Sequence, residues 1–376
     1  MTADVVVVGA GVIGASAAWH LASRGARVTV VDRAAEPGGG STARATGGYR
    51  AQFGSEVNVR LSLLSRGKLL RFRDEVGADA GYRPAGYLFV ARRAEHLAAL
   101  REAQAVQRAC GLAEARMVDA EEAARLNPAI VRDGVLGGAF CPTDGFIAPM
   151  QILRGYLDAA RRLGARVELG AEVMGLKRGA VETTRGAFPA GCVVNAGGAW
   201  AAAVAEMAGV DLPVRPLRRH VAPTVGTGAL SSDHPMTVFC EDGFHFRVRD
   251  GRALLLWPGG AETVDPFDTR VDADWLDRVE ALARERVPGL ADVAVDRAGA
   301  WAGLYEMSPD GHAILGRVGD MVLANGSSGH GVMHAPALGQ LIAEIVLDGK
   351  AHSLDVNALR PERFAEGKTV RAVGLL

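Results

Sequence analysis

Three glycines near the start of the chain have the spacing that binds a nucleotide pyrophosphate. Gly9, Gly11 and Gly14 are spaced as Gly-x-Gly-x-x-Gly, with Val12 and Ile13 between the last two. The first glycine permits a tight turn, the second lets the backbone approach a pyrophosphate, and the third lets a helix pack closely on a strand. The free N–H groups at the start of that helix would then face the phosphates. The motif therefore predicts a dinucleotide-binding site.

An acidic residue follows where a ribose hydroxyl would need an acceptor. Asp32 ends an apolar run, about 20 residues beyond the glycine motif. A carboxylate at this place accepts a hydrogen bond from a ribose 2′-hydroxyl and repels a 2′-phosphate, which disfavours NADP. The motif and the acid together leave NAD and FAD open.

The segment 38–50 favours the longer of these two ligands. It reads Gly-Gly-Gly-Ser-Thr-Ala-Arg-Ala-Thr-Gly-Gly-Tyr-Arg and comes soon after the second apolar run. A loop this rich in glycine and hydroxyl groups suits a ligand much longer than one mononucleotide. A plain surface loop is the alternative interpretation.

A βαβ unit must position these residues. Unbroken apolar runs predict strands that are buried on both faces of a parallel sheet. The predicted strands of this kind are 5–8, 28–31, 192–196 and 321–324. A helix that ends at Gly25 connects the first two, and another helix is predicted from about residue 337 to 347. Glycines follow the later strands as well.

Alternating sequences predict a second sheet, which is antiparallel. Residues 244–248 read Phe-His-Phe-Arg-Val, with Asp-Gly turn signals on both sides. We therefore expect an α/β fold in which a discontinuous Rossmann-type domain carries an inserted antiparallel-sheet substrate-binding domain. The expected ranges are 1–80, 143–211 and 298–376 for the nucleotide-binding domain, and 81–142 and 212–297 for the substrate-binding domain.

Composition excludes several classes of protein. The chain has 42 basic and 43 acidic residues, so it lacks the basic excess that nucleic-acid binding requires. Four cysteines lie far apart with no Cys-x-x-Cys pair, which argues against a zinc site or a disulfide framework and favours the reducing cytoplasm. Residues 5–23 carry no charged side chain. They also lack a basic leader and contain three glycines, so we expect neither a membrane span nor a signal peptide.

With these motifs in place, the chain resembles the D-amino-acid-oxidase-type FAD oxidoreductases. The resemblance is carried by the glycine motif and by four further segments. These are 38–55, 193–200 (Val-Val-Asn-Ala-Gly-Gly-Ala-Trp), 301–316 with its Ser-Pro-Asp, and 325–340, which begins Asn-Gly-Ser-Ser-Gly-His-Gly. Within this group the chain is most similar to sarcosine oxidase β subunits and to the β subunit of dye-linked proline dehydrogenases. The resemblance implies that the nucleotide-binding domain is an FAD-binding domain. It also implies noncovalent FAD, because the cysteine that tethers flavin in monomeric sarcosine oxidases is missing here.

By the same resemblance, five segments are expected to contact FAD. The expected residues are Gly9, Gly11, Val12, Ile13, Gly14, Asp32 and Arg33 at the ADP half; Ser41, Thr42, Arg44, Thr46, Gly47 and Gly48 at the pyrophosphate and flavin edge; Val173 at the adenine; Gly197, Gly198 and Trp200 over the cofactor; and Gly329, His330, Gly331, Val332 and Met333 at the isoalloxazine ring. A glycine turn that leads into a helix also places N–H donors where charge develops on a flavin.

An amino-acid substrate needs a cation for its carboxylate and an apolar cage. Arg50 and Arg247 are the carboxylate candidates, because guanidinium binds carboxylate with two parallel hydrogen bonds. His220 resembles the histidine near the flavin in proline dehydrogenase β subunits, where it would act as a base or orient the substrate. Tyr305 is a candidate cage wall. His330 is expected to act through its backbone and ring packing.

The expected function is oxidation of the C–N bond of a small amino acid. The substrate would be a secondary amine such as proline, sarcosine or another N-alkyl amino acid, with hydride transfer to flavin N5 and hydrolysis of the imine. Two alternatives remain open: oxidation of a hydroxy acid or polyol phosphate, and a flavin-binding subunit of a larger complex. The sequence also leaves open whether the chain forms a homo-oligomer or needs a partner subunit.

The expected electron acceptor is oxygen or a dye or quinone. Monomeric sarcosine oxidases carry lysines near the flavin, whereas this chain has Met333 at one such position and the cation-free stretch 253–258 at the other. The resemblance therefore implies a slow reaction with oxygen.

Overall fold

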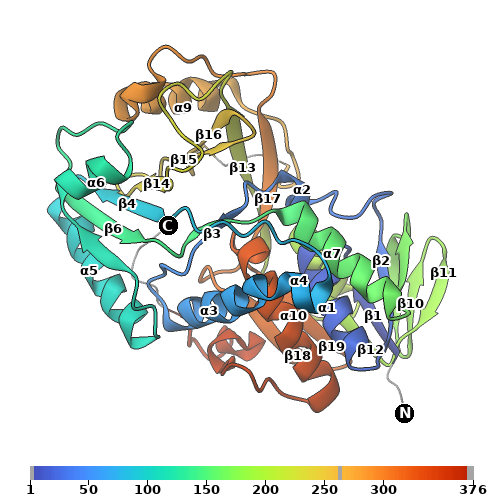
Figure 1. The fold of residues 1–376 in the computed structure, drawn as a ribbon. Coiled ribbons are helices and arrows are strands. Elements are labelled where there is room, and N and C mark those ends of the chain that lie inside the picture. The colour runs from blue at the N-terminus through green and yellow to red at the C-terminus, as the bar shows by residue number, and fades with distance from the viewer. Residues whose placement is uncertain (1–3, 261–264, 371–376) are drawn as a thin grey trace.

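A six-stranded sheet assembled from distant parts of the chain forms the centre of one half of the molecule (Figure 1). The structure is a computed structural model, and it describes residues 4–260 and 265–370. The strands of this sheet, in the order in which they lie side by side, are β18 (Ile314–Val318), β19 (Met321–Asn325), β12 (Cys192–Asn195), β1 (Asp4–Val8), β2 (Arg27–Asp32) and β8 (Arg166–Leu169). All neighbours are parallel except β18 and β19.

Both faces of this sheet are covered, as the unbroken apolar runs predict. Val5 and Val7 pack against helices on one face, whereas Val6 and Val8 pack on the other face against a small three-stranded sheet. The helices of the first face are α1 (Val12–Ser23), α3 (Glu56–Leu70), α7 (Pro149–Arg162) and α10 (Gly331–Asp348). The small antiparallel sheet comprises β9 (Val173–Lys177), β10 (Ala180–Thr183) and β11 (Gly186–Pro189).

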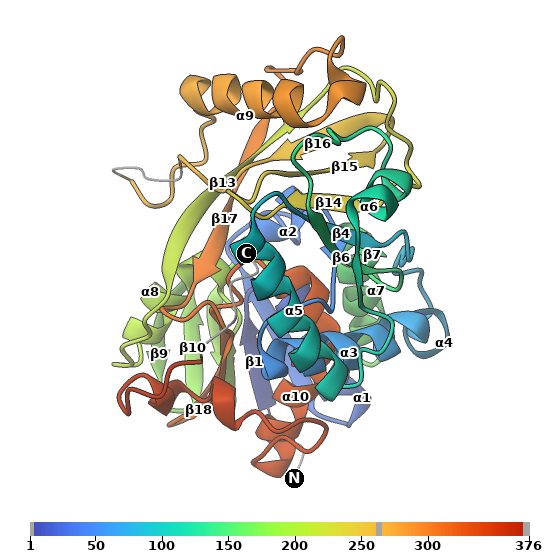
Figure 2. The same ribbon diagram turned by 90° about the vertical axis from the view of Figure 1, so that its left-hand side faces the viewer.

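An eight-stranded sheet forms the other half, and α9 (Ala273–Arg286) covers one of its faces (Figure 2). The strands, in their order across the sheet, are β17 (Trp301–Met307), β13 (Arg215–Pro223), β16 (Arg252–Leu256), β15 (His245–Arg249), β14 (Met236–Phe239), β4 (Tyr87–Ala91), β6 (Gly137–Cys141) and β5 (Arg116–Val118). Only β14 and β4 pair in parallel. In Figure 2 the long strands β13 and β17 run from beneath α9 towards the six-stranded sheet.

One long helix, α5, and several short elements complete the described fold. They are α2 (Ser41–Arg44), β3 (Gly48–Tyr49), α4 (Phe72–Val76), α5 (Ala94–Ala109), α6 (Ala120–Leu126), β7 (Gly145–Phe146), α8 (Ala201–Glu206) and four 3₁₀ turns at Gly198–Trp200, Pro288–Leu290, Asn357–Leu359 and Pro361–Arg363. No helix of residues 4–260 and 265–370 is long and apolar enough to cross a membrane. The charge-free stretch 5–23 is divided between β1 and α1.

The predicted fold class and the four predicted parallel strands are confirmed, and two boundaries differ. Helix α10 begins at Gly331, not near residue 337, because Pro336 lies in its second turn and costs only the hydrogen bond to the carbonyl of Val332. Strand β17 pairs with β13 along its whole length, so residues 301–307 belong to the eight-stranded sheet. We therefore propose the predicted division into two domains with one change: residues 301–307 belong to the substrate-binding domain. The ends of the predicted ranges, 1–3 and 371–376, lie outside the described residues.

Candidate active site

One cavity of about 440 Å³ connects the glycine motif with the eight-stranded sheet. Its wall includes twenty of the residues expected to bind the cofactor. These are Gly9, Gly11, Val12, Ile13, Asp32, Arg33, Ser41, Thr42, Arg44, Thr46, Gly47, Gly48, Val173, Gly197, Gly198, Trp200, Gly329, Gly331, Val332 and Met333. Of the other expected residues, Tyr305 also lines the cavity, whereas Gly14, Arg50, His220, Arg247 and His330 do not.

The glycine turn has the geometry that its spacing predicts. Gly9 adopts φ +111°, and a Cβ atom there would lie 2.3 Å from the carbonyl oxygen of Ala196. At Gly14 a Cβ would lie 1.9 Å from the carbonyl oxygen of Gly9, so this glycine serves helix–strand packing. At Gly11, in contrast, the nearest atom to a Cβ is Oγ1 of Thr42 at 3.5 Å. The turn is therefore closed towards the protein and open towards the cavity, which is a cradle for a phosphate group.

Asp32 holds the backbone at the carboxyl ends of the first two strands. Its Oδ2 accepts a hydrogen bond from the N–H of Ala10 at 2.6 Å, and its Oδ1 accepts one from the N–H of Ala34 at 2.8 Å. The carboxylate still lines the cavity, so its remaining lone pairs can accept a ribose hydroxyl. Nearby, the guanidinium of Arg33 lies 4.0 Å from the ring centroid of Trp200, which also stacks on Phe267.

Polar residues of the eight-stranded sheet line the opposite end of the cavity. Arg219 of β13, Tyr87 of β4, His245 of β15 and Tyr305 of β17 all lie in this wall. The guanidinium carbon of Arg219 is 5.6 Å from the ring centroid of Tyr305. Burial raises the pKa of both tyrosines, to about 12 for Tyr87, so their phenols remain protonated donors. Burial also lowers the pKa of His245 to about 4, so its ring is neutral.

These geometric features fit a dinucleotide that extends from a pyrophosphate cradle to a second ring system at the sheet. The family model described as "FAD dependent oxidoreductase" (DAO) matches residues 4–345. The chain belongs to this family. FAD is therefore the cofactor of this chain. Within the described residues, no cluster of three or more His, Cys, Asp or Glu side chains could hold a metal ion.

Relatives of this FAD-dependent oxidoreductase include several amino-acid-oxidising enzymes. The solved structure of L-proline dehydrogenase from P. horikoshii has a TM-score of 0.90 and 28% identity, and the match covers 98% of this chain and 99% of that one. Glycine oxidase from Geobacillus kaustophilus gives a TM-score of 0.84 and 25% identity over 96% of this chain and 99% of that one. In sequence, FAD-dependent oxidoreductase domain-containing protein 1 of Bos taurus is 30% identical over 97% of this chain and 85% of that protein.

The structure places His220 on the wrong face of β13 for a catalytic role. Successive residues of a strand point to opposite faces, so Arg219 and Val221 face the cavity while His220 faces α9. Its ring stacks on Trp275 at a centroid distance of 4.8 Å, and its Nε2 lies 3.8 Å from Oδ2 of Asp272. Burial lowers the pKa of His220, so it is a neutral core residue.

Arg247 binds the backbone of the loop at 38–50 and does not line the cavity. Its Nη1 donates hydrogen bonds to the carbonyl oxygens of Thr46 at 2.7 Å and Gly47 at 3.2 Å. Its guanidinium also lies 3.6 Å from the ring centroid of Phe146. Burial lowers the pKa of Arg247 to about 9. The geometry therefore assigns this arginine to loop positioning.

Arg50 and His330 lie together behind the cavity wall. Nη2 of Arg50 is 3.4 Å from Nε2 of His330, and the guanidinium covers the ring of Phe53 at 4.3 Å. His330 precedes α10 and contacts Phe53 edge-to-face, so only its neighbours Gly329 and Gly331 reach the cavity. Burial lowers the pKa of His330 well below its usual value. The ring therefore packs the turn and is uncharged at neutral pH.

Sequence reasoning missed Arg219, Tyr87 and His245. The alternation in 215–223 indicates a strand, but it does not say which of the consecutive residues Arg218, Arg219 and His220 faces the cofactor. The pairing of β13 with β17 determines which side chain faces the cavity, and in this pairing Arg219 lies opposite Gly303.

Proposed function

We propose that this FAD-dependent oxidoreductase oxidises the C–N bond of a small amino acid, specifically a secondary amine such as proline, sarcosine or another N-alkyl amino acid. FAD, when bound, supplies the hydride acceptor. The protein's own task is to bind the substrate carboxylate, orient the amine and exclude water from the reacting carbon. One observation carries this proposal, namely the position of Arg219.

Arg219 is a cation in the cavity wall that has no acidic partner among residues 4–260 and 265–370. Its one hydrogen bond among the described residues goes to the carbonyl oxygen of Arg218 at 3.3 Å, and no described carboxylate lies within 4.0 Å of it. Burial lowers the pKa of Arg219, which a bound anion would reverse. The protonated phenols of Tyr87 and Tyr305 line the same wall and can donate to the same anion. Together these groups suit a substrate carboxylate.

The amine side of the substrate has a matching acceptor and an apolar wall. Nδ1 of His245 lies 2.7 Å from the carbonyl oxygen of Gly243, which fixes the tautomer with its proton on Nδ1 and leaves Nε2 as an acceptor for an amine N–H. Val221, Met236 and Leu256 line the same end of the cavity and can contact an N-alkyl group. The similarity to L-proline dehydrogenase supports a secondary amine. The four free cysteines support the cytoplasm as the location.

An anaerobic substrate screen tests this proposal. Proline, sarcosine and other N-alkyl amino acids should bleach the flavin absorbance faster than primary amino acids do. The control substrates are α-hydroxy acids and polyol phosphates, which should leave the spectrum unchanged. Bleaching by those alcohols alone would reject the proposal. Bleaching that requires a second, co-purifying protein in size-exclusion chromatography would identify the chain as a subunit of a larger complex.

The reduced enzyme should react slowly with oxygen and faster with a dye or quinone. A cation near the flavin stabilises the superoxide formed by the first electron transfer, and such electrostatic stabilisation contributes a few kcal/mol. None of the four lysines lines the cavity, and bound substrate neutralises Arg219. Stopped-flow mixing of substrate-reduced enzyme with air measures the rate, and Leu256→Lys should accelerate it. Rapid, complete reoxidation of the unmodified enzyme with stoichiometric peroxide would show an oxidase instead.

A further inference from the structure

Two side chains from distant parts of the chain stack on Trp200 at the nucleotide end of the cavity. The guanidinium carbon of Arg33 lies 4.0 Å from the ring centroid of Trp200. The ring of Phe267 is nearly parallel to that of Trp200, with an interplanar angle of 11° and 5.5 Å between the centroids. Arg33 and Trp200 line the cavity, whereas Phe267 does not. Phe267 belongs to the segment 265–272, which lies in the sequence between β16 of the eight-stranded sheet and α9.

The contact between Arg33 and Trp200 crosses the carboxyl end of β1. Strands β12 and β2 lie on either side of β1, and the glycine turn follows β1. Arg33 comes directly after β2, and Trp200 ends the 3₁₀ turn that follows β12, so the two side chains meet across the strand between them. The indole also reaches the loop at 38–50, because a Cβ atom on Gly40 would lie 3.6 Å from Cζ3 of Trp200. In sheets of this kind, nucleotides bind in the crevice outside these strand ends.

Arg218 of β13 anchors the segment that carries Phe267. The guanidinium of Arg218, a residue that is 4% exposed, pairs with Asp272 and donates a hydrogen bond to the carbonyl oxygen of Arg270 at 2.9 Å. The segment 265–272 is therefore fixed to the eight-stranded sheet just beyond Phe267 in the sequence. An anchored backbone reduces the entropy that is lost when the phenyl ring stacks on the indole.

We propose that Phe267 is a positioning residue for the cofactor, which acts through Trp200: it holds the indole at the nucleotide end of the cavity and thereby slows the dissociation of FAD. Release of FAD from this end requires the indole to move aside, and that movement breaks the stack with Phe267. The loss of a stacked aromatic pair changes a rate about twofold to tenfold. The proposal does not depend on which substrate the enzyme oxidises.

Dilution of the holoenzyme, followed by the fluorescence of released FAD, measures the dissociation rate. Phe267→Ala should raise this rate about twofold to tenfold, whereas Phe267→Tyr keeps the aromatic ring and should leave the rate close to that of the unmodified enzyme. The melting temperature of FAD-free Phe267→Ala should match that of the unmodified chain, because Phe267 is 39% exposed. Equal dissociation rates for the unmodified enzyme and Phe267→Ala would overturn the proposal.

A double-mutant cycle shows whether Phe267 acts through Trp200. In the Trp200→Ala background, Phe267→Ala should cause no further increase in the dissociation rate, because the ring on which Phe267 stacks is gone. A second increase of the same size would reject the proposal and give Phe267 a separate structural role. If Trp200→Ala does not retain FAD, the comparison of Phe267→Ala with Phe267→Tyr decides, because equally fast release from both also rejects it.

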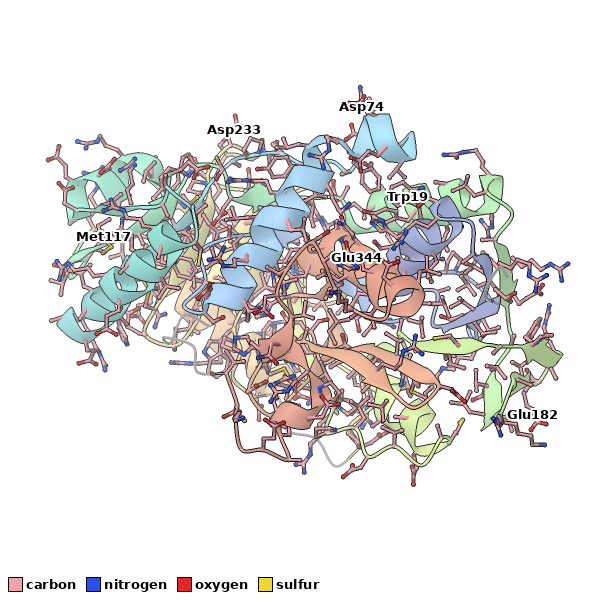
Figure 3. The ribbon with its side chains drawn as sticks, turned by 90° about the horizontal axis from the view of Figure 1, so that it is seen from below. Trp19, Asp74, Met117, Glu182, Asp233 and Glu344 are labelled. Atoms are coloured by element: carbon pink, nitrogen blue, oxygen red, sulfur yellow. The ribbon has the colours of Figure 1, made fainter. Side chains whose placement is uncertain are left out.

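Met117→Ala is the matched control. Met117 (labelled in Figure 3) is a half-buried apolar residue on β5, which lies at the opposite edge of the eight-stranded sheet from β17, and it does not line the cavity. Its replacement removes apolar surface without touching the stack, so the dissociation rate of FAD should stay the same. An equal rise in Met117→Ala and Phe267→Ala would show that the loss of any apolar side chain from this sheet loosens the cofactor, and it would overturn the proposal.

Discussion

Replacing Arg219 by methionine should raise KM for the amino-acid substrate about tenfold to a hundredfold while FAD remains bound. A hydrogen bond to a charged group contributes about 1.5–3 kcal/mol, and methionine keeps the apolar length of the side chain without the charge. Because Arg219 contacts no part of the glycine turn or of the loop at 38–50, the flavin absorbance spectrum should stay the same. Steady-state kinetics with an artificial electron acceptor and anaerobic substrate titration measure the two effects.

Arg247→Met provides the opposite pattern. This change removes the hydrogen bonds to the carbonyl oxygens of Thr46 and Gly47. The FAD dissociation constant should therefore rise, while KM in FAD-saturated enzyme should change little. If Arg219→Met left the kinetics unchanged and Arg247→Met weakened substrate binding, the carboxylate anchor would be Arg247, one of the two candidates that the sequence predicts.

Replacing Gly9 by alanine should yield colourless, destabilised protein. An alanine at φ +111° is strained by about 1–2 kcal/mol or more, and its Cβ would lie 2.3 Å from the carbonyl oxygen of Ala196. Relief of this clash separates the glycine turn from the strand end that closes it, so both the melting temperature and FAD content should fall. Thermal unfolding and the ratio of absorbance at the flavin and protein maxima measure these losses.

Gly11→Ala separates binding from folding at the same turn. Its Cβ meets no protein atom closer than 3.5 Å and projects into the phosphate cradle. The melting temperature of FAD-free protein should therefore match that of the unmodified chain, while FAD affinity falls. A yellow Gly9→Ala protein with an unchanged melting temperature would show that the turn can relax without cost.

The residues that line the nucleotide end of the cavity could be predicted because their motifs lie close together in the sequence. Gly9, Gly11 and Asp32 belong to one βαβ unit, in which turn geometry and strand burial follow from neighbouring residues. The predicted βαβ unit is present, and Gly9, Gly11 and Asp32 line one cavity, whereas their contact with FAD stays a prediction. The start of α10 escaped prediction because Pro336 reads as a helix boundary, although its missing N–H costs a single hydrogen bond in the second turn.

The substrate half depends on pairing between residues far apart in the sequence. A shift of one residue in the register of β13 would exchange the positions of Arg219 and His220, and no local pattern sets that register. The contacts of Arg247 could not be predicted from local sequence either. Alternation marks its strand, but the loop carbonyls that bind its guanidinium lie about 200 residues earlier in the chain.

The strand order of the six-stranded sheet sets a sequence of events during synthesis. Of its central strands, β1 is synthesised early and β12 about halfway along the chain. The cavity wall also needs β19, the turn at 326–331 and α10, which are synthesised late. At roughly 5–20 residues per second, Gly331 leaves the ribosome about 16–60 s after Gly14. During that interval the apolar face of α1 lacks its cover, α10. The nucleotide domain can therefore complete its core, and the cavity its wall, only once the chain is almost finished.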